Sequence, residues 1–409
     1  MHILFILLSL LGSFYFLIKK RTFDFFSVAY FSSIIYFLPG YFGYTLVSPT
    51  SLKMYILDET YLIMIFVQMS ILVGGCFFDT LRKKTEIKTT IKNTNLTSEI
   101  ALFICLLGFM LTIISSGSNL FDANKGVMVE SLGRWHMIMR FGAALAVVIA
   151  FVMKKKLIFI ISLLVILFDI FLGFRSIAAI VTISLITYWL TKQGSQRLLI
   201  NQRKFVKYTL ILGLFFFSYK QVYSAIKGGN WELVKERISD PQFYIYSIMN
   251  SEPFTTQSIL NTVVASNFQT GFENMIGLIY QFILFSPSLG AEFITFNQQF
   301  QPALFPTITF GLANNIWAQM WSVGGWTLLI LFLIINILIL SFGSYLIRMN
   351  DPNLKALILL LFSYWSFYIH RNDIIYQINL EKRVFLFWFI CILTSVIINS
   401  IVKKSINKY

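Results

Sequence analysis

The sequence has few charged residues and few cysteines. Only 12% of its 409 residues are charged while 57% are hydrophobic, and the mean hydropathy of +0.74 is too high for a water-soluble domain. The three cysteines, Cys76, Cys105 and Cys391, form no CxxC pair, which gives no support to a disulfide framework or a zinc site. Because GxxxxGK[ST] and HExxH motifs are missing, the sequence offers no built-in ATPase and argues against a zinc protease.

Long apolar runs dominate what remains. A run of roughly 20 residues crosses a hydrocarbon core of about 30 Å. We therefore predict an all-α polytopic membrane protein, one integral membrane domain over residues 1–409, with about eleven spanning helices near residues 1–18, 25–44, 61–78, 99–117, 137–153, 157–174, 177–191, 208–223, 324–346, 355–369 and 384–402. The charges Lys19, Lys20 and Arg21 follow the first run instead of preceding it, so we expect a retained helix and not a signal peptide.

Basic residues collect in alternate loops between these runs. The loops assigned to the cytoplasm hold 21 of the 33 lysines and arginines and five of the 18 acidic residues, with clusters at residues 19–21, 82–92, 154–156, 192–207, 348–355 and 403–408. The positive-inside rule then predicts an external N-terminus and a cytoplasmic C-terminus in a bacterial inner membrane. This pattern also explains the net charge of +15 without nucleic acid as a partner.

Residues 224–323 stand apart as a long external stretch between the eighth and ninth predicted helices. Because a structureless loop of this length is unusual, we expect a folded periplasmic cap. Within it, the moderately apolar segment from Met275 to Leu289 predicts an interfacial or re-entrant helix. A single extra span there would turn Lys403 and the basic tail outward, whereas a pair of spans stays open, giving a range of about 11 to 14 helices.

Isolated basic side chains are expected near the external face: Arg134, Arg140, Arg175, Lys220, Arg237 and Arg371. A charge at the bilayer centre costs on the order of 2.5 to 3.5 kcal/mol, so charges beside spanning helices need a reason. Guanidinium groups suit bidentate contacts with phosphate, which predicts a site for a lipid-linked phosphate or diphosphate. The alternative is that these side chains snorkel to lipid head groups or pair with Asp169, Asp373 and Glu381.

Candidate proton acceptors are less well marked. His370, beside Arg371, and His136 are the histidines near the external face, although a lone interfacial histidine is more often a solvated bystander. Asp169 lies six residues before Arg175, where a buried ion pair is a better explanation than catalysis. The cap offers further carboxylates without a spacing that singles one out: Glu232, Glu236, Asp240, Glu252, Glu273 and Glu292. We take His370, Glu232 and Glu292 as the catalytic candidates.

Several short motifs accompany this layout of helices and a large external loop: the hairpin Gly173-Phe174-Arg175-Ser176, the segment Asn314-Asn315-Ile316-Trp317 leading to residues 321–326, and the late Arg371. Together they resemble the O-antigen polymerase (Wzy) family of bacterial membrane proteins. Arg175, Arg237 and Arg371 match the arginines of the family's external loops. Some members also carry a glycine eleven residues after such an arginine, and this chain does not.

The resemblance implies a metal-independent glycosyltransferase with a GT-C-like helical bundle and no cofactor. Such an enzyme moves a growing glycan from one undecaprenyl diphosphate to a newly arrived lipid-linked repeat unit at the periplasmic face. Its implied partners are the lipid-linked oligosaccharide, membrane lipids and a chain-length regulator protein. Arg175 and Arg371, with Arg140 or Arg237, would hold the diphosphate, while His370 or a cap carboxylate takes the acceptor proton.

Two other functions stay open. A lipid-linked oligosaccharide flippase or polysaccharide transporter would bind the same diphosphate without breaking a bond, and an O-antigen ligase would transfer the glycan to a lipid core. Transporters commonly show internal repeats and a site near the middle of the membrane. This sequence has no evident repeat and places its unusual charges at one face, so we favour a transferase.

Overall fold

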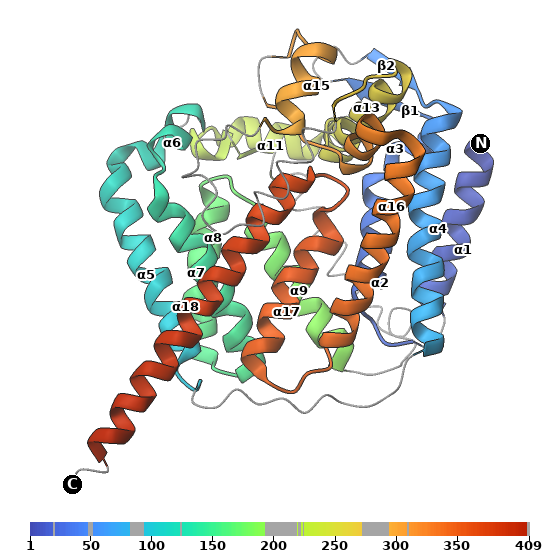
Figure 1. Ribbon diagram of the computed structural model, residues 1–409. Helices are drawn as coiled ribbons and strands as arrows, with labels where there is room; N and C mark the ends of the chain where they lie inside the picture. Colours follow the sequence, from blue (N-terminus) through green and yellow to red (C-terminus); the bar gives the residue numbers. More distant parts are fainter. Residues whose placement is uncertain are drawn as a thin grey trace.

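A computed structural model describes residues 1–18, 21–47, 52–81, 94–122, 125–192, 219, 222–223, 225–271, 294–308 and 311–406. Within these ranges the chain is almost entirely helical. Long helices run side by side as a bundle (Figure 1): α1 (His2–Ile18), α2 (Phe25–Tyr36), α4 (Asp58–Leu81), α5 (Thr97–Ser116), α7 (Arg134–Met153), α8 (Lys156–Phe171), α9 (Ser176–Lys192), α16 (Ile316–Leu346), α17 (Pro352–Tyr368) and α18 (Ile374–Ile406).

Shorter elements gather at one end of this bundle, which we call the cap end: α3 (Leu38–Phe42), β1 (Tyr44–Val47), β2 (Leu52–Tyr55), η1 (Gly117–Phe121), α6 (Lys125–Ser131), α11 (Trp231–Ser239), α12 (Pro241–Met249), α13 (Glu252–Ala265) and α15 (Phe296–Leu304). The two strands pair antiparallel, with Tyr44 opposite Tyr55. The N-terminus lies at the cap end, whereas α18 finishes at the opposite end, which we call the tail end (Figure 1).

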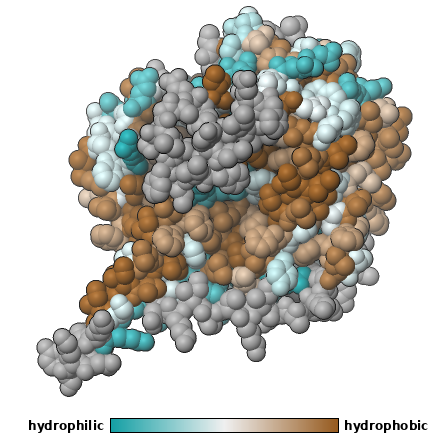
Figure 2. Space-filling model, viewed as in Figure 1, coloured by the Kyte–Doolittle hydropathy of each residue, from teal (hydrophilic) through white to brown (hydrophobic). Residues whose placement is uncertain are grey.

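The helices confirm an all-α membrane protein. Five described segments are long and apolar enough to cross a bilayer: Asp58–Leu81, Thr97–Leu120, Arg134–Met153, Ile316–Leu346 and Ile374–Lys403. Helices α1, α2 and α9 are shorter but also apolar. Hydrophobic side chains cover much of the bundle surface (Figure 2), as lipid contact requires. Most of the predicted helix at 208–223, and the whole segment 275–289, lie outside the described residues.

Three predicted boundaries are wrong. The span predicted over residues 25–44 ends at Tyr36, because the proline at position 39 cannot continue the hydrogen-bond ladder of α2, and a separate short helix follows. Helix α16 begins at Ile316 and not at Gly324, since the Asn315 side chain accepts hydrogen bonds from the backbone at 317 and 318. Helix α18 begins at Ile374, well before the predicted residue 384.

Small residues bring α5 and α7 into close contact. A Cβ atom on Gly108 would overlap the Met139 backbone nitrogen, and one on Gly142 would lie 2.8 Å from the Cys105 nitrogen. Helices in lipid associate through such close backbone approaches, because they gain little from the hydrophobic effect. Residues 141–150 of α7 are consequently all buried, and α7 serves as a fixed support for side chains at its cap end.

Helix α13 is tied to the bundle by buried polar side chains. The Asn261 Oδ1 atom accepts hydrogen bonds from the Leu57 backbone N–H and the Thr60 hydroxyl, each at 3.0 Å. The Asn315 amide donates to the Thr256 carbonyl at 3.0 Å. Buried amides that are hydrogen-bonded in this way fix the orientation of a helix. The N-terminus of α13 is therefore held in place over the bundle.

A buried ion-pair cluster closes the tail end. The Arg21 guanidinium, with a side chain 3% exposed, donates through Nε to Asp79 at 2.9 Å, through Nη2 to Asp24 at 2.8 Å and through Nη1 to the Ser27 hydroxyl at 2.7 Å. Asp79 also accepts a hydrogen bond from the Tyr15 hydroxyl at 2.6 Å. In this tail-end cluster, one buried arginine is hydrogen-bonded to two carboxylates and a hydroxyl.

Candidate active site

Three of the predicted arginines lie at the cap end on separate elements. Arg140 is in the second turn of α7, Arg175 precedes α9 in the turn after α8, and Arg371 lies in the turn between α17 and α18. The turn between α17 and α18 is far from the other two elements in the sequence, and the bundle brings all three to the same side (Figure 1).

Asp169 holds Arg140 in place. The Arg140 Nε atom donates to Asp169 Oδ2 at 3.0 Å, while His136 Nε2 donates to Asp169 Oδ1 at 2.8 Å. His136 and Arg140 are four residues apart and so share one face of α7. The Arg140 Nη2 atom also donates to the Ser176 hydroxyl at 2.7 Å, and the Phe174 ring lies 5.1 Å from the guanidinium carbon. Asp169 thus forms a buried ion pair, as predicted, but with Arg140 and His136 and not with Arg175.

The turn that carries Arg175 depends on Gly173. This residue has φ +88°, in the left-handed region, and a Cβ atom there would lie 2.8 Å from the Tyr223 ring. The Phe174 N–H donates to the Asp169 carbonyl at 3.0 Å and closes the end of α8. Glycine at position 173 thus places Arg175, which is half-buried, directly before the first turn of α9.

Arg371 is paired with a carboxylate of the cap. Its Nε atom lies 3.1 Å from Glu252 Oε2, and the two side chains are 28% and 32% exposed. Burial alone would lower the pKa of Arg371, but the charge of Glu252 and the neighbouring tyrosines outweigh it and raise that pKa. Glu252 is the first residue of α13, so the anchoring of that helix fixes the position of its carboxylate.

Two buried tyrosines mark where these charges meet. The charges of Arg371, Arg175, Arg140 and Glu252 all act on the Tyr368 hydroxyl. The charges of Glu252, Arg371 and Arg175 likewise act on the hydroxyl of Tyr36, at the end of α2. The three arginines therefore share one neighbourhood, roofed by the N-terminus of α13. We call Arg140, Arg175, Arg371 and Glu252 the arginine site.

His370 is in the interior of the protein, directly before Arg371. It is 1% exposed, its Nδ1 atom accepts a hydrogen bond from Trp317 Nε1 at 3.0 Å, and its Nε2 atom lies 3.4 Å from the Ala29 carbonyl oxygen. Burial lowers the pKa of His370 to about 3, so the ring is neutral at physiological pH. Because both nitrogens are engaged inside the protein, this histidine is suited to joining α2, α16 and α17.

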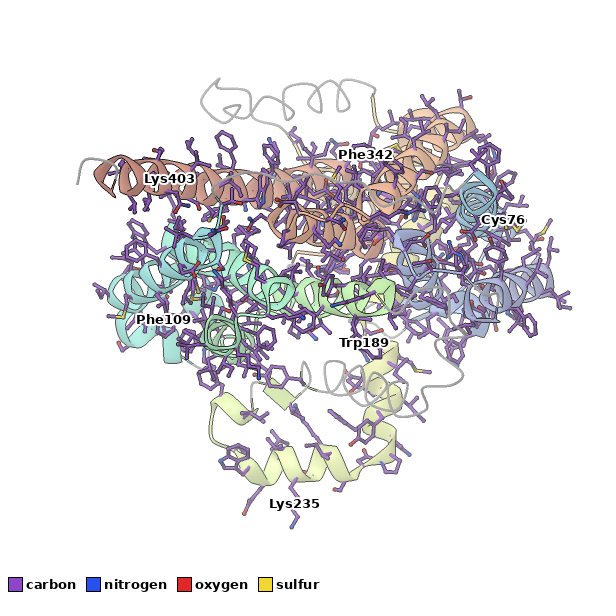
Figure 3. All side chains as sticks on the ribbon, turned by 90° about the horizontal axis from the view of Figure 1, so that it is seen from below. Cys76, Phe109, Trp189, Lys235, Phe342 and Lys403 are labelled. Carbon is purple, nitrogen blue, oxygen red and sulfur yellow. The ribbon has the colours of Figure 1, made fainter. Side chains whose placement is uncertain are left out.

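The remaining predicted site residues lie elsewhere or outside the described ranges. Arg134 is exposed at the start of α7. Glu232 and Arg237 belong to α11, and Lys235 of the same helix lies at the margin of the molecule (Figure 3). Lys220 and Glu292 are outside the described residues. In the parts of the chain that the structure describes, no three His, Cys, Asp or Glu side chains come together as a metal site would need.

Glu252, Tyr36 and Tyr368 belong to this site but were not among the residues predicted from the sequence. Glu252 was one of six cap carboxylates without a distinguishing spacing. The signal that marks it is the run Ser251-Glu252-Pro253, because serine is a good N-cap and proline favours the first turn of a helix. That signal would have predicted a carboxylate fixed at the start of a helix.

The chain matches no protein-family model, no curated protein and no solved structure. The resemblance found in the short motifs therefore stays a hypothesis. What the protein does has to be argued from the arginine site and the bundle that carries it.

Proposed function

We propose that the protein is a glycosyltransferase that polymerises lipid-diphosphate-linked repeat units at one face of a bacterial inner membrane. The observation that carries the proposal is the arginine site: three arginines from three separate elements converge, beside one carboxylate, at one end of an apolar helical bundle. This end is the periplasmic face if eleven helices span the membrane with the N-terminus outside.

The convergence of three arginines favours a diphosphate ligand. Asp169 pairs with Arg140 and His136, and Glu252 pairs with Arg371. The side chains of Arg140 and Arg371 are 18% and 28% exposed, so the site is neither sealed nor fully solvated. Arginines in such partly dry surroundings bind phosphate oxygens through strong, charge-assisted hydrogen bonds.

The same groups support glycosyl transfer. An acceptor hydroxyl oxygen forms the new bond to the anomeric carbon, and the bond from that carbon to the diphosphate breaks, with its electron pair leaving on the diphosphate. The arginines stabilise the charge that develops on this leaving group. Glu252 accepts the proton from the acceptor hydroxyl once the diphosphate has taken its place beside Arg371.

The position of the site favours this function over transport. A flippase or polysaccharide transporter is expected to bind its substrate near the middle of the membrane. The arginine site lies at the turns that end α8 and α17, so its ligand would be held at a membrane face. A ligase would use the same chemistry and differ in its acceptor, and the assay below separates the two by its product.

Purified protein in lipid nanodiscs, supplied with synthetic undecaprenyl-diphosphate repeat units and no nucleotide sugar, tests the proposal. We expect a ladder of products spaced by one repeat unit on a gel. Arg175→Lys should lose the ladder, because lysine keeps the charge but loses the bidentate contact. Arg134→Lys, at the exposed start of α7, is the matched control and should keep it. Unchanged substrate with folded, unmodified protein would refute the proposed function.

A further inference from the structure

A cavity of about 620 Å³ lies in the side of the bundle between α16, α17 and α18. Its walls are apolar and come from all three helices, including Leu331, Ile335, Phe362, Trp365 and Phe385. Leu331, Ile335 and Phe385 are large hydrophobic side chains that are exposed on the surface of the bundle. We call this cavity the membrane groove.

The tilt of α18 accounts for the groove. Helix α18 leans away from α16 toward the tail end, and α17 lies between them (Figure 1). Trp365 of α17 donates a hydrogen bond to the buried Asn336 side chain of α16 at 2.8 Å, which keeps these two helices together while α18 diverges. The result is a wedge whose floor is α17 and whose sides are parts of two membrane-spanning segments.

The cap end of the groove lies near the arginine site. Trp365 in its wall is one turn before Tyr368 on α17, and Ile374 in its wall is three residues after Arg371. A polar series follows the first turns of α18 at this end. The Asn372 amide donates to Gln377 Oε1 at 2.7 Å, and the Gln377 amide donates to Glu381, a residue of the groove wall, at 3.1 Å.

The groove is apolar along most of its length. Met320 and Ile374 line it at the cap end, Ile339 and Phe342 line it toward the tail end, and Glu381 and Lys382 lie between them on α18. Because its cap end is close to Arg371 in the chain, a lipid whose hydrocarbon chain occupied the groove would place its head group beside the arginine site. A protein surface of this kind within a bilayer is in contact with hydrocarbon chains.

We infer that the membrane groove binds the hydrocarbon chain of a polyprenyl diphosphate and guides its head group to Arg371. The inference rests on the proposed function for the identity of the head group. Binding of the chain, however, depends on the groove alone and can be measured without turnover.

A photo-crosslinking residue placed in the groove tests the binding. The residue p-benzoylphenylalanine in place of Ile335, which lines the groove, is compared with the same residue in place of Ile334, which is exposed but outside the lining. The full-length protein is embedded in nanodiscs of saturated phosphatidylcholine containing polyprenyl diphosphate and is then irradiated. We expect adducts with the mass of the polyprenyl diphosphate at position 335 and far fewer at position 334.

Two other crosslinking results would overturn the inference. Equal amounts of adduct at both positions would mean that the polyprenyl chain contacts the protein only as part of the surrounding bilayer. Crosslinks from position 335 to a peptide of the same chain, or to a second copy, would mean that protein fills the groove. Either result leaves the proposed function standing if the product ladder still forms.

Filling the groove gives an independent measurement. Ile335→Trp should raise KM for a long-chain lipid-diphosphate donor about ten-fold, equivalent to about 1.4 kcal/mol, and leave KM for a short-chain, water-soluble donor unchanged. Ile334→Trp is the control and should alter neither. An equal loss with both donors would argue against chain binding. If the unmodified protein turns over neither donor, the proposed function fails, and the crosslinking still decides the fate of the groove.

Discussion

The two ends of the bundle use arginine in opposite ways. In the tail-end cluster, Arg21 is 3% exposed and its donors are taken up by Asp24, Asp79 and Ser27. In the arginine site, three arginines stand beside two carboxylates, Asp169 and Glu252, and the Arg371 side chain is 28% exposed. The first arrangement is buried, whereas the second is partly exposed, so that an anion can reach its guanidinium groups.

This difference in burial distinguishes an arginine that stabilises the fold from arginines that can bind a ligand. A buried ion-pair cluster favours one packing of the helices and is not accessible to a substrate. A partly exposed charged group contributes little to stability and can still bind a ligand. Substitutions at the two ends should accordingly affect different measurements.

The largest expected effect is on folding, at the tail end. Arg21→Met leaves Asp24 and Asp79 without their cation, which should cost about 3 to 5 kcal/mol of stability. Loss of the monodisperse peak in size-exclusion chromatography and a lower melting temperature would report it. Arg371→Met is the matched change at the cap end and should fold with a melting temperature close to that of the unmodified protein. Equal destabilisation by both variants would remove the distinction between the two ends.

At the cap end the expected loss is catalytic. Glu252→Gln keeps the size of the side chain but removes the proton acceptor, so the rate of glycan polymerisation should fall about 100-fold while the protein stays folded. Glu232→Gln, on the exposed face of α11, is the control and should retain full activity. A Glu252→Gln variant with an unchanged rate would assign the proton to another group.

An intermediate effect is expected where α7 supports the cap end. Gly142→Leu forces a large side chain against the Cys105 backbone and should cost at least about 1 to 3 kcal/mol, measured as a lower melting temperature in detergent. Gly133→Leu places the same side chain at a glycine that has no atom within 4 Å of its would-be Cβ. We expect that control to be nearly neutral. Comparable losses in both variants would show that the crossing of α5 and α7 is not tight.

The smallest effect concerns pH. In the unfolded chain His370 takes up a proton near its ordinary pKa of 6.5, whereas burial lowers its pKa to about 3 in the folded protein. Acid therefore favours the unfolded state, and the contribution of this residue to stability is present above pH 6.5 and decreases as the pH falls, by at most about 1.4 kcal/mol per pH unit. Melting temperatures between pH 7 and pH 5 should decline less steeply in His370→Asn. Identical slopes would contradict this assignment.

Much of the bundle could be predicted from local sequence. Each apolar run must form its own backbone hydrogen bonds in lipid, so its length and composition are enough to place a helix. The errors occur where a side chain decides the boundary, as at Asn315, which caps α16, and at the proline after Tyr36. Gly324, the predicted start of α16, has a non-helical conformation and is the position of a kink.

The arginine site could be predicted only in part. The alternation of basic and less basic loops predicted that Arg140, Arg175 and Arg371 lie at one end of the bundle, because membrane topology is encoded locally in the sequence. Which carboxylate meets which arginine depends on packing between distant segments. Asp169 was expected to reach Arg175, yet its hydrogen bonds go to Arg140 and His136, and nothing near Glu252 in the sequence indicates its pairing with Arg371.

The length of α18 has a consequence for the membrane itself. A helix of 33 residues is about 50 Å long, while the hydrocarbon core measures about 30 Å, so α18 must lean or project beyond the bilayer. A thinner bilayer favours more lean and a thicker one favours less. Because the lean of α18 sets the width of the wedge beside α16, the thickness of the surrounding membrane becomes a physical control on how much room a lipid chain finds there.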